Sequence, residues 1–153
     1  MRYWLFKSEP SAYSYDDLVR EGVGTWDGVR NFQARNFLRD DMKPGDLVLF
    51  YHSSIDPTAV VGVAEVVREG YPDHTAWDPK NKHFDPKSTR EKPQWYMVDV
   101  KARERFPHQV TTEEMRGNAR LAGMMLLRRG MRLSIQPVTK EEFEAVCAMG
   151  RKA

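Results

Sequence analysis

Three neighbouring residues near position 52 carry side chains of the kind that hydrolases use. Within five positions, His52, Ser53 and Asp56 offer a base, a nucleophile and a carboxylate. Catalytic triads are assembled in space rather than by adjacency in sequence, and the Gly-x-Ser-x-Gly turn that presents a nucleophilic serine in many hydrolases is absent. Serine and aspartate are also ordinary turn residues. We therefore expect a strand-end histidine followed by a turn, and keep a hydrolase that uses His52 and Ser53 only as an alternative.

The polar, proline-containing segment at positions 71–93 holds several side chains that can bind metals. His74, Asp78, His83 and Asp85 lie there, but their spacing matches neither a zinc site nor a calcium loop, and the chain has a single cysteine. The glycine-rich motifs that cradle phosphates are absent as well. We expect no metal and no cofactor. A loop of about twenty residues in a compact domain is often functional.

The segment WDGVRN at positions 26–31 combines an aromatic ring with polar side chains. Helical periodicity does not explain Trp26, which follows a glycine-containing stretch and precedes an amphipathic one. Its indole can stack on a flat ligand, Asp27 can accept from an exocyclic amine, and Asn31 can donate and accept along a base edge. In a purely structural alternative, Trp26 packs in the core, Asn31 caps a helix and Arg30 pairs with an acid. The residues alone leave both alternatives open.

Several basic residues are candidates for phosphate contacts. They are Lys7, Arg30, Arg35, Arg39, Arg128, Arg129 and Arg132. The net charge is only +2, which excludes the strongly basic surface of a protein that attracts nucleic acid over long distances. Binding of nucleic acid would therefore have to rest on a local site.

Strands and short helices that alternate irregularly must position these groups. Period-two apolar runs predict strands at 2–7, 47–52, 59–69, 95–106 and 132–137. Capping residues predict helices after Ser14, at 32–42 after Asn31, and after Thr111 and Thr139, with a further helical piece at 121–128. The first strand is apolar on both faces and should be central. This order predicts one α+β domain over 1–153, with a strongly curved mixed sheet or small barrel.

The bulk properties place the chain among globular proteins. It has 153 residues, a length typical of one domain. Its apolar stretches are far shorter than the roughly 20 residues that span a bilayer. Charges come too early at the N-terminus for a secretory signal, and a single cysteine suits a reducing compartment. We expect a cytoplasmic protein with no membrane partner.

Four segments carry a resemblance to a known family. They are WLFKSEP at 4–10, WDGVRNFQARN at 26–36, FYHS at 50–53 and RLSIQPV at 132–138. In this order they resemble the EVE domain family over about residues 3–146, although Phe32 stands where we expect Tyr and Ile135 where we expect Val. The resemblance implies a PUA-like fold, a curved mixed sheet or small pseudo-barrel flanked by short helices. It also implies a relation to YTH domains, which read methylated adenine in RNA through an aromatic cage.

The resemblance and the residues together predict a non-catalytic protein that binds a modified nucleobase in DNA or RNA. Trp26 would be a wall of an aromatic cage, and the base would be single-stranded or flipped out of a duplex. Binding of a small planar molecule or a free nucleotide is the alternative. The oligomeric state is left open. The expected ligand-binding residues are Trp26, Asp27, Val29, Arg30, Asn31, Lys7, Ser8, Phe50, Ser53, Trp77, Trp95, Leu133 and Ser134.

Overall fold

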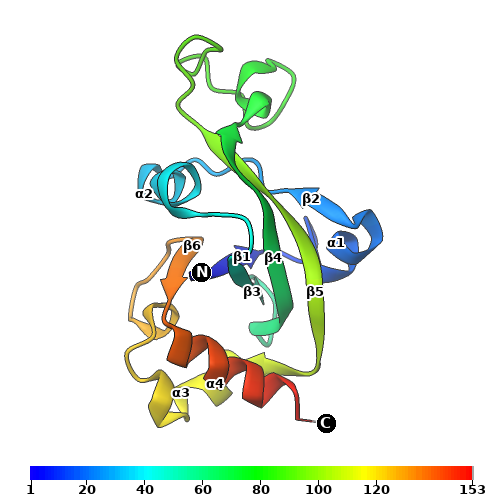
Figure 1. Cartoon of the computed structure of the whole chain (residues 1–153), viewed down its shortest axis with the longest axis vertical. Helices are drawn as coiled ribbons and strands as arrows, with labels where there is room; N and C mark the ends of the chain where they lie inside the picture. The colour runs from blue at the N-terminus through cyan, green and yellow to red at the C-terminus, as the bar shows by residue number, and fades with distance from the viewer. Residues whose placement is uncertain (153) are drawn as a thin grey trace.

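The core of the computed structural model, which describes residues 1–152, is one open six-stranded sheet (Figure 1). Its strands are β1 Tyr3–Ser8, β2 Val23–Thr25, β3 Leu47–His52, β4 Ala59–Pro72, β5 Tyr96–Thr111 and β6 Ile135–Val138. They are ordered β2-β5-β4-β3-β1-β6, and only the β1–β3 pair is parallel. The expected α+β class with a mixed sheet is confirmed, although the sheet does not close into a barrel. Residue 153, the last of the expected domain, lies outside the described residues.

The first strand is internal, as its two apolar faces predicted. β1 lies between β3 and β6. Trp4 and Phe6 pack into one core cluster, whereas Leu5 packs into the other. Because successive side chains of a β-strand point to opposite faces of the sheet, neighbouring residues of this strand pack into opposite cores.

Short helices cover both faces of the sheet (Figure 1). They are α1 Tyr15–Glu21, α2 Phe32–Asn36, α3 Thr112–Arg116 and α4 Lys140–Gly150, with the π-helical turn η1 Phe37–Asp41 and the 3₁₀ turns η2 His74–Trp77, η3 Ala119–Leu121 and η4 Met125–Leu127. The first cluster takes residues from α1, α2 and η1, and the second from α3, η3 and α4. No helix in residues 1–152 is long and apolar enough to cross a bilayer.

The predicted helix starts are correct because they depend on local hydrogen bonds. Ser14, Thr111 and Thr139 each cap a helix, and each forms a reciprocal capping box with the acid three residues on. Asn31 caps α2 by accepting from the Ala34 amide at 2.9 Å.

Other predicted boundaries are wrong. The helix expected at 32–42 changes after Asn36 into the wider π-helical turn η1. The helical piece expected at 121–128 consists of the separate 3₁₀ turns η3 and η4, because Met124 is extended between them. β6 starts only at Ile135, and the three-residue β2, which is absent from the predicted strands, is held by pairing with β5.

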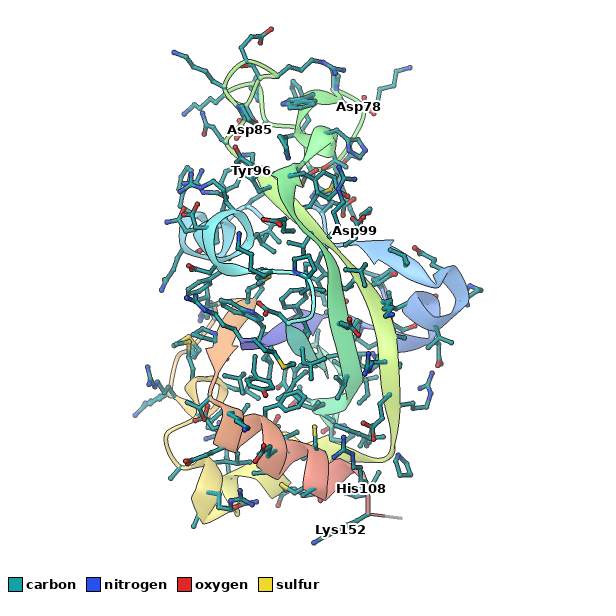
Figure 2. All side chains as sticks on the ribbon, viewed as in Figure 1. Asp78, Asp85, Tyr96, Asp99, His108 and Lys152 are labelled. Atoms are coloured by element: carbon teal, nitrogen blue, oxygen red, sulfur yellow. The ribbon has the colours of Figure 1, made fainter. Side chains whose placement is uncertain are left out.

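β4 and β5 form a long hairpin whose connection we call the excursion, residues 73–95. The excursion projects at one end of the molecule, whereas α3 and α4 lie at the other (Figure 1). Figure 2 shows Asp78 and Asp85 in the excursion and Lys152 at the opposite end. Both hairpin strands run past the expected ends of 69 and 106, so cross-strand pairing rather than local sequence decides their length.

Candidate functional site

A cavity of about 920 Å³ lies between β1, the loop after β2 and the excursion. A volume of this size suits a small organic ligand or a base with part of its backbone. It is lined by Lys7, Ser8, Glu9, Ala12, Tyr13, Glu21, Thr25, Trp26, Asp27, Gly28, Val29, Arg30, Lys80, Asn81, Lys82, His83 and Ser134. Seven of the thirteen expected binding residues are among them.

Trp26 forms an aromatic wall of the cavity that is also anchored in the core. Its amide donates to the carbonyl of Val98 at 2.8 Å, which extends the pairing of β2 with β5. Its ring packs on Phe6 and Phe50, with centroids 5.0 and 5.5 Å apart, and meets Tyr13 edge-on at 6.0 Å. Only 9% of the residue is exposed. The core packing fixes the orientation of the indole that faces the cavity.

Gly28 lets the excursion close over this loop. Its φ of +76° favours glycine, and a Cβ at this position would lie 2.5 Å from Nε2 of His83. Its amide donates to Asp73 at 2.8 Å. The absence of a side chain at position 28 therefore brings His83 to the cavity wall.

Arg30 links the loop to the excursion. Its guanidinium donates to the carboxylate of Asp73 at 3.0 Å and to the carbonyl of His83 at 2.7 and 3.1 Å. Further bonds go to the Val29 carbonyl and the Thr75 hydroxyl. These contacts occupy all five N–H donors of an arginine. Arg30 lines the cavity as expected, but its structural role leaves no donor for a ligand phosphate.

Asp73, on which this link depends, is fully buried. Burial alone raises the pKa of its carboxyl group. The hydrogen bonds from Thr75, Gly28 and Arg30 outweigh that effect and hold the pKa below its usual range. Asp73 is therefore ionised, and its carboxylate holds the loop after β2 and the excursion together.

Asp27 is the opposite case. Its side chain is exposed to the cavity and has no hydrogen-bond or ion-pair partner within residues 1–152. Crowding by the surrounding protein raises the pKa of its carboxyl group, and the nearby Asp73 carboxylate raises it further. An acceptor held without a partner beside an aromatic wall is the arrangement expected of a ligand-binding group.

Lys7 and Ser8 of β1, together with Ser134, also line the cavity. The Lys7 amide donates to the Ser134 carbonyl at 2.9 Å, and its Nζ donates to the Met131 carbonyl at 3.3 Å. Burial lowers the pKa of the Lys7 ammonium group. The Ser8 hydroxyl donates to the Tyr13 carbonyl. Lys7 Nζ keeps donors for a ligand, because among the described residues only one of its three N–H groups has a partner.

The other expected binding residues do not line the cavity. They are Asn31, Phe50, Ser53, Trp77, Trp95 and Leu133. Asn31 caps α2, Phe50 lies behind Trp26 and is fully buried, and Leu133 packs on the first core cluster. The two tryptophans stabilise the excursion. Trp95 donates to Asp85 at 2.7 Å and stacks on Phe32, whereas Trp77 lies under the Arg90 guanidinium.

His52 and Ser53 give no support to a hydrolase. Nε2 of His52 accepts a hydrogen bond from the Tyr15 amide at 3.1 Å, so the nitrogen that would act as a base is occupied at the start of α1. Burial lowers the pKa of this imidazole. Neither residue borders the cavity.

Sequence reasoning missed the cavity residues that the excursion contributes, Lys80, Asn81, Lys82 and His83. One signal was present. The sequence WDPK at 77–80 is echoed by FDPK at 84–87, and both aspartates accept from the lysine amide two residues on, at 2.9 and 3.0 Å. The two segments form the same kind of turn, but the sequence could not show where these turns lie relative to Trp26. No group of three metal-ligating side chains gathers within residues 1–152.

Comparison with known proteins identifies the family. The model of the EVE domain matches residues 2–149. The chain belongs to the EVE domain family. Thymocyte nuclear protein 1 of Mus musculus is 40% identical over 96% of this EVE domain and 73% of its own length, and that of Gallus gallus is 42% identical over 96% and 68%.

The same EVE fold is present in solved structures. The crystal structure of human THYN1 in complex with 5-methylcytosine-containing DNA superimposes with a TM-score of 0.92 at 38% identity, covering 100% of this chain and 99% of the other. A Pseudomonas putida protein gives 0.92 at 44% identity, covering 96% and 98%.

The named relatives correct one expectation. They are nuclear proteins by name, which contradicts the cytoplasmic location predicted from composition. Composition alone does not distinguish the nucleus from the cytoplasm.

Proposed function

We propose that this EVE domain binds a modified cytosine of DNA in the cavity beside Trp26, without catalysing a reaction. Human THYN1, which shares the fold and 38% of its residues, has been crystallised with DNA that contains 5-methylcytosine. In this chain, the indole of Trp26 would stack on the base and the carboxylate of Asp27 would accept from its exocyclic amine.

The observation that supports the proposal is that Asp27 and Trp26 lie next to each other at the cavity. A partnerless carboxylate with a raised pKa is unfavourable for the folded protein, and it lies next to an aromatic wall whose orientation is fixed by Phe6 and Phe50. A cytosine amine supplies the missing donor. The other rings at the cavity are Tyr13 and His83, so the proposed cage differs from one built with Trp77 or Trp95.

Magnitudes limit how tightly the cavity alone can bind. Stacking contributes about 1–3 kcal/mol per base, and a hydrogen bond to a charged group about 1.5–3 kcal/mol. Extracting a base from a duplex costs a few kcal/mol. A buried methyl contributes about 0.8 kcal/mol, or roughly fourfold in affinity. We therefore propose a single-stranded or flipped base as the ligand, with contacts to the backbone supplying the remaining affinity.

Substitution of Asp27 tests the proposal without disturbing the core. With single-stranded oligonucleotides carrying cytosine or 5-methylcytosine, read by tryptophan fluorescence, Asp27→Ala should weaken binding about 10- to 100-fold, the value of a charged hydrogen bond. Asp27→Asn keeps an acceptor oxygen and should fall between Asp27→Ala and the wild type. Glu141→Gln, an exposed carboxylate on the distant α4, is the control and should bind normally.

Two outcomes would contradict the proposal. One is unchanged binding by Asp27→Ala, and the other is equal affinity of the wild type for the methylated and unmethylated strands. Trp26→Ala is the less informative variant, because this ring also packs in the core and its loss destabilises the fold. A small planar ligand in place of DNA would show binding that hardly changes with salt.

A further inference from the structure

The basic residues of this chain are unevenly distributed. Residues 115–140 contain six of the 24 Lys and Arg and none of the 22 Asp and Glu, so the remainder has 18 basic against 22 acidic residues and a net charge of −4. The small total of +2 therefore conceals a strongly basic segment.

Three arginines close together in this segment, within residues 128–132, are without a partner among the described residues. Arg128, Arg129 and Arg132 are exposed, and none forms an ion pair or side-chain hydrogen bond within residues 1–152. Seven other arginines do pair with acids: Arg2, Arg20, Arg30, Arg39, Arg103, Arg105 and Arg151. We call residues 128–132 the arginine segment. Its guanidinium groups therefore have hydrogen-bond donors available for an external anion.

The arginine segment adjoins the cavity. Ser134 lines the cavity, and Lys7 contacts the chain on both sides of Arg132, at the carbonyls of Met131 and Ser134. Since a residue spans at most about 3.5 Å, Arg132 lies within about 7 Å and Arg128 within about 21 Å of Ser134 along the chain. At about 3.4 Å per nucleotide of a strand, that range corresponds to the first six or so phosphates beside the base.

Basic residues of the excursion also line the cavity. Lys80 and Lys82 border it, as Ser134 does. A strand that places one base on Trp26 would therefore have basic residues of the excursion, as well as the arginine segment, close to its phosphates.

We propose that Arg128, Arg129 and Arg132 bind the phosphates of the strand that flanks the base in the cavity. The proposal rests on the proposed function and makes the physiological ligand a polymer rather than a free nucleotide. Contacts between these arginines and the phosphates would also supply the affinity that the cavity alone cannot.

The test replaces all three arginines by glutamine in the full chain. The probes are single strands of about 12 nucleotides, with and without one central 5-methylcytosine, and the mononucleotide 5-methyl-dCMP. Each phosphate contact on a single strand contributes a slope of about 0.7 in log K against log salt, so the slope should fall by about 2 and affinity at about 0.15 M salt by about 50-fold. Binding of the mononucleotide should stay within about twofold, because one phosphate makes few of these contacts.

A matched control separates local contacts from overall charge. Arg2→Gln, Arg103→Gln and Arg151→Gln together remove the same three charges from arginines that already pair with Asp41, Glu65 and Glu104. This variant should keep most of the wild-type affinity and slope for the strands.

The outcomes are distinguishable from those of the cavity proposal. An unchanged salt slope in the arginine variant, or an equal loss in the control, would overturn the arginine proposal whatever Asp27→Ala does. Loss of binding to anionic lipid vesicles by the variant, with its affinity for the strands unchanged, would overturn it as well. Equal binding of methylated and unmethylated strands would refute only the cavity proposal, because the slope is measured on both.

Discussion

Asp73 never touches the cavity, yet its removal should destroy the site. Its carboxylate accepts from Arg30, from the Gly28 amide and from Thr75, and no part of it is exposed. Asp73→Ala leaves the Arg30 guanidinium, itself only 23% exposed, without its counterion. Breaking a buried ion pair by removing one partner costs about 3–5 kcal/mol, and the partial exposure of Arg30 favours the lower end.

The expected loss of about 3 kcal/mol corresponds to a melting temperature lowered by about 6–12 °C in a chain of this length. Thermal and urea unfolding followed by circular dichroism measure it. Asp40→Ala is the control, because its pair with Arg39 lies on the surface and should contribute little. Oligonucleotide binding by Asp73→Ala should also be lost below the melting point, since the loop after β2 and the excursion lose their link.

The pH dependence gives an independent check. A carboxyl group whose pKa is lowered by folding stabilises the protein above its unfolded pKa of about 4, and this stabilisation is lost as the pH falls through the lower, folded value. The difference in stability between wild type and Asp73→Ala should therefore be full at neutral pH and shrink below about pH 4. The reasoning would be refuted if Asp73→Ala lowered the free energy of unfolding no more than Asp40→Ala does. It would also be refuted if the loss caused by Asp73→Ala did not change with pH down to the acid transition.

Three further predictions concern single groups. Asp27→Asn should raise stability at neutral pH and have no effect below about pH 4, because a carboxyl group whose pKa is raised by folding destabilises the folded state once it is ionised and has no effect while it is protonated in both states; a Tm series against pH measures this. Gly28→Ala should destabilise by about 1–2 kcal/mol for its left-handed backbone and by more for the clash with His83, and Gly130→Ala, with the same φ and open space around it, isolates the backbone cost in urea titrations. Cys147 is buried, which raises its pKa to about 11, so a thiol reagent at about pH 8 should label it only at the rate of unfolding.

Local sequence was sufficient wherever local contacts decide the structure. Ser14, Thr111 and Thr139 start helices through bonds to residues three positions away, and the alternation in β1 sends Trp4 and Leu5 to opposite cores. The family motifs likewise identified the fold class. Sequence reasoning was weakest at the ends of β4 and β5, because pairing with a distant strand extends both.

At the candidate site, the residue types in the loop after β2 were visible in the sequence, but their roles were not. The sequence by itself determined that Trp26, Asp27, Arg30 and Asn31 form one polar and aromatic group, and it left ligand binding and structural support equally open. Only the tertiary structure separated these roles. Asn31 and Arg30 are committed to hydrogen bonds, whereas Asp27, beside Trp26, has no partner among residues 1–152. The physical reason is that the partners come from the excursion and the opposite strands, and contacts between segments so far apart along the chain exist only after folding.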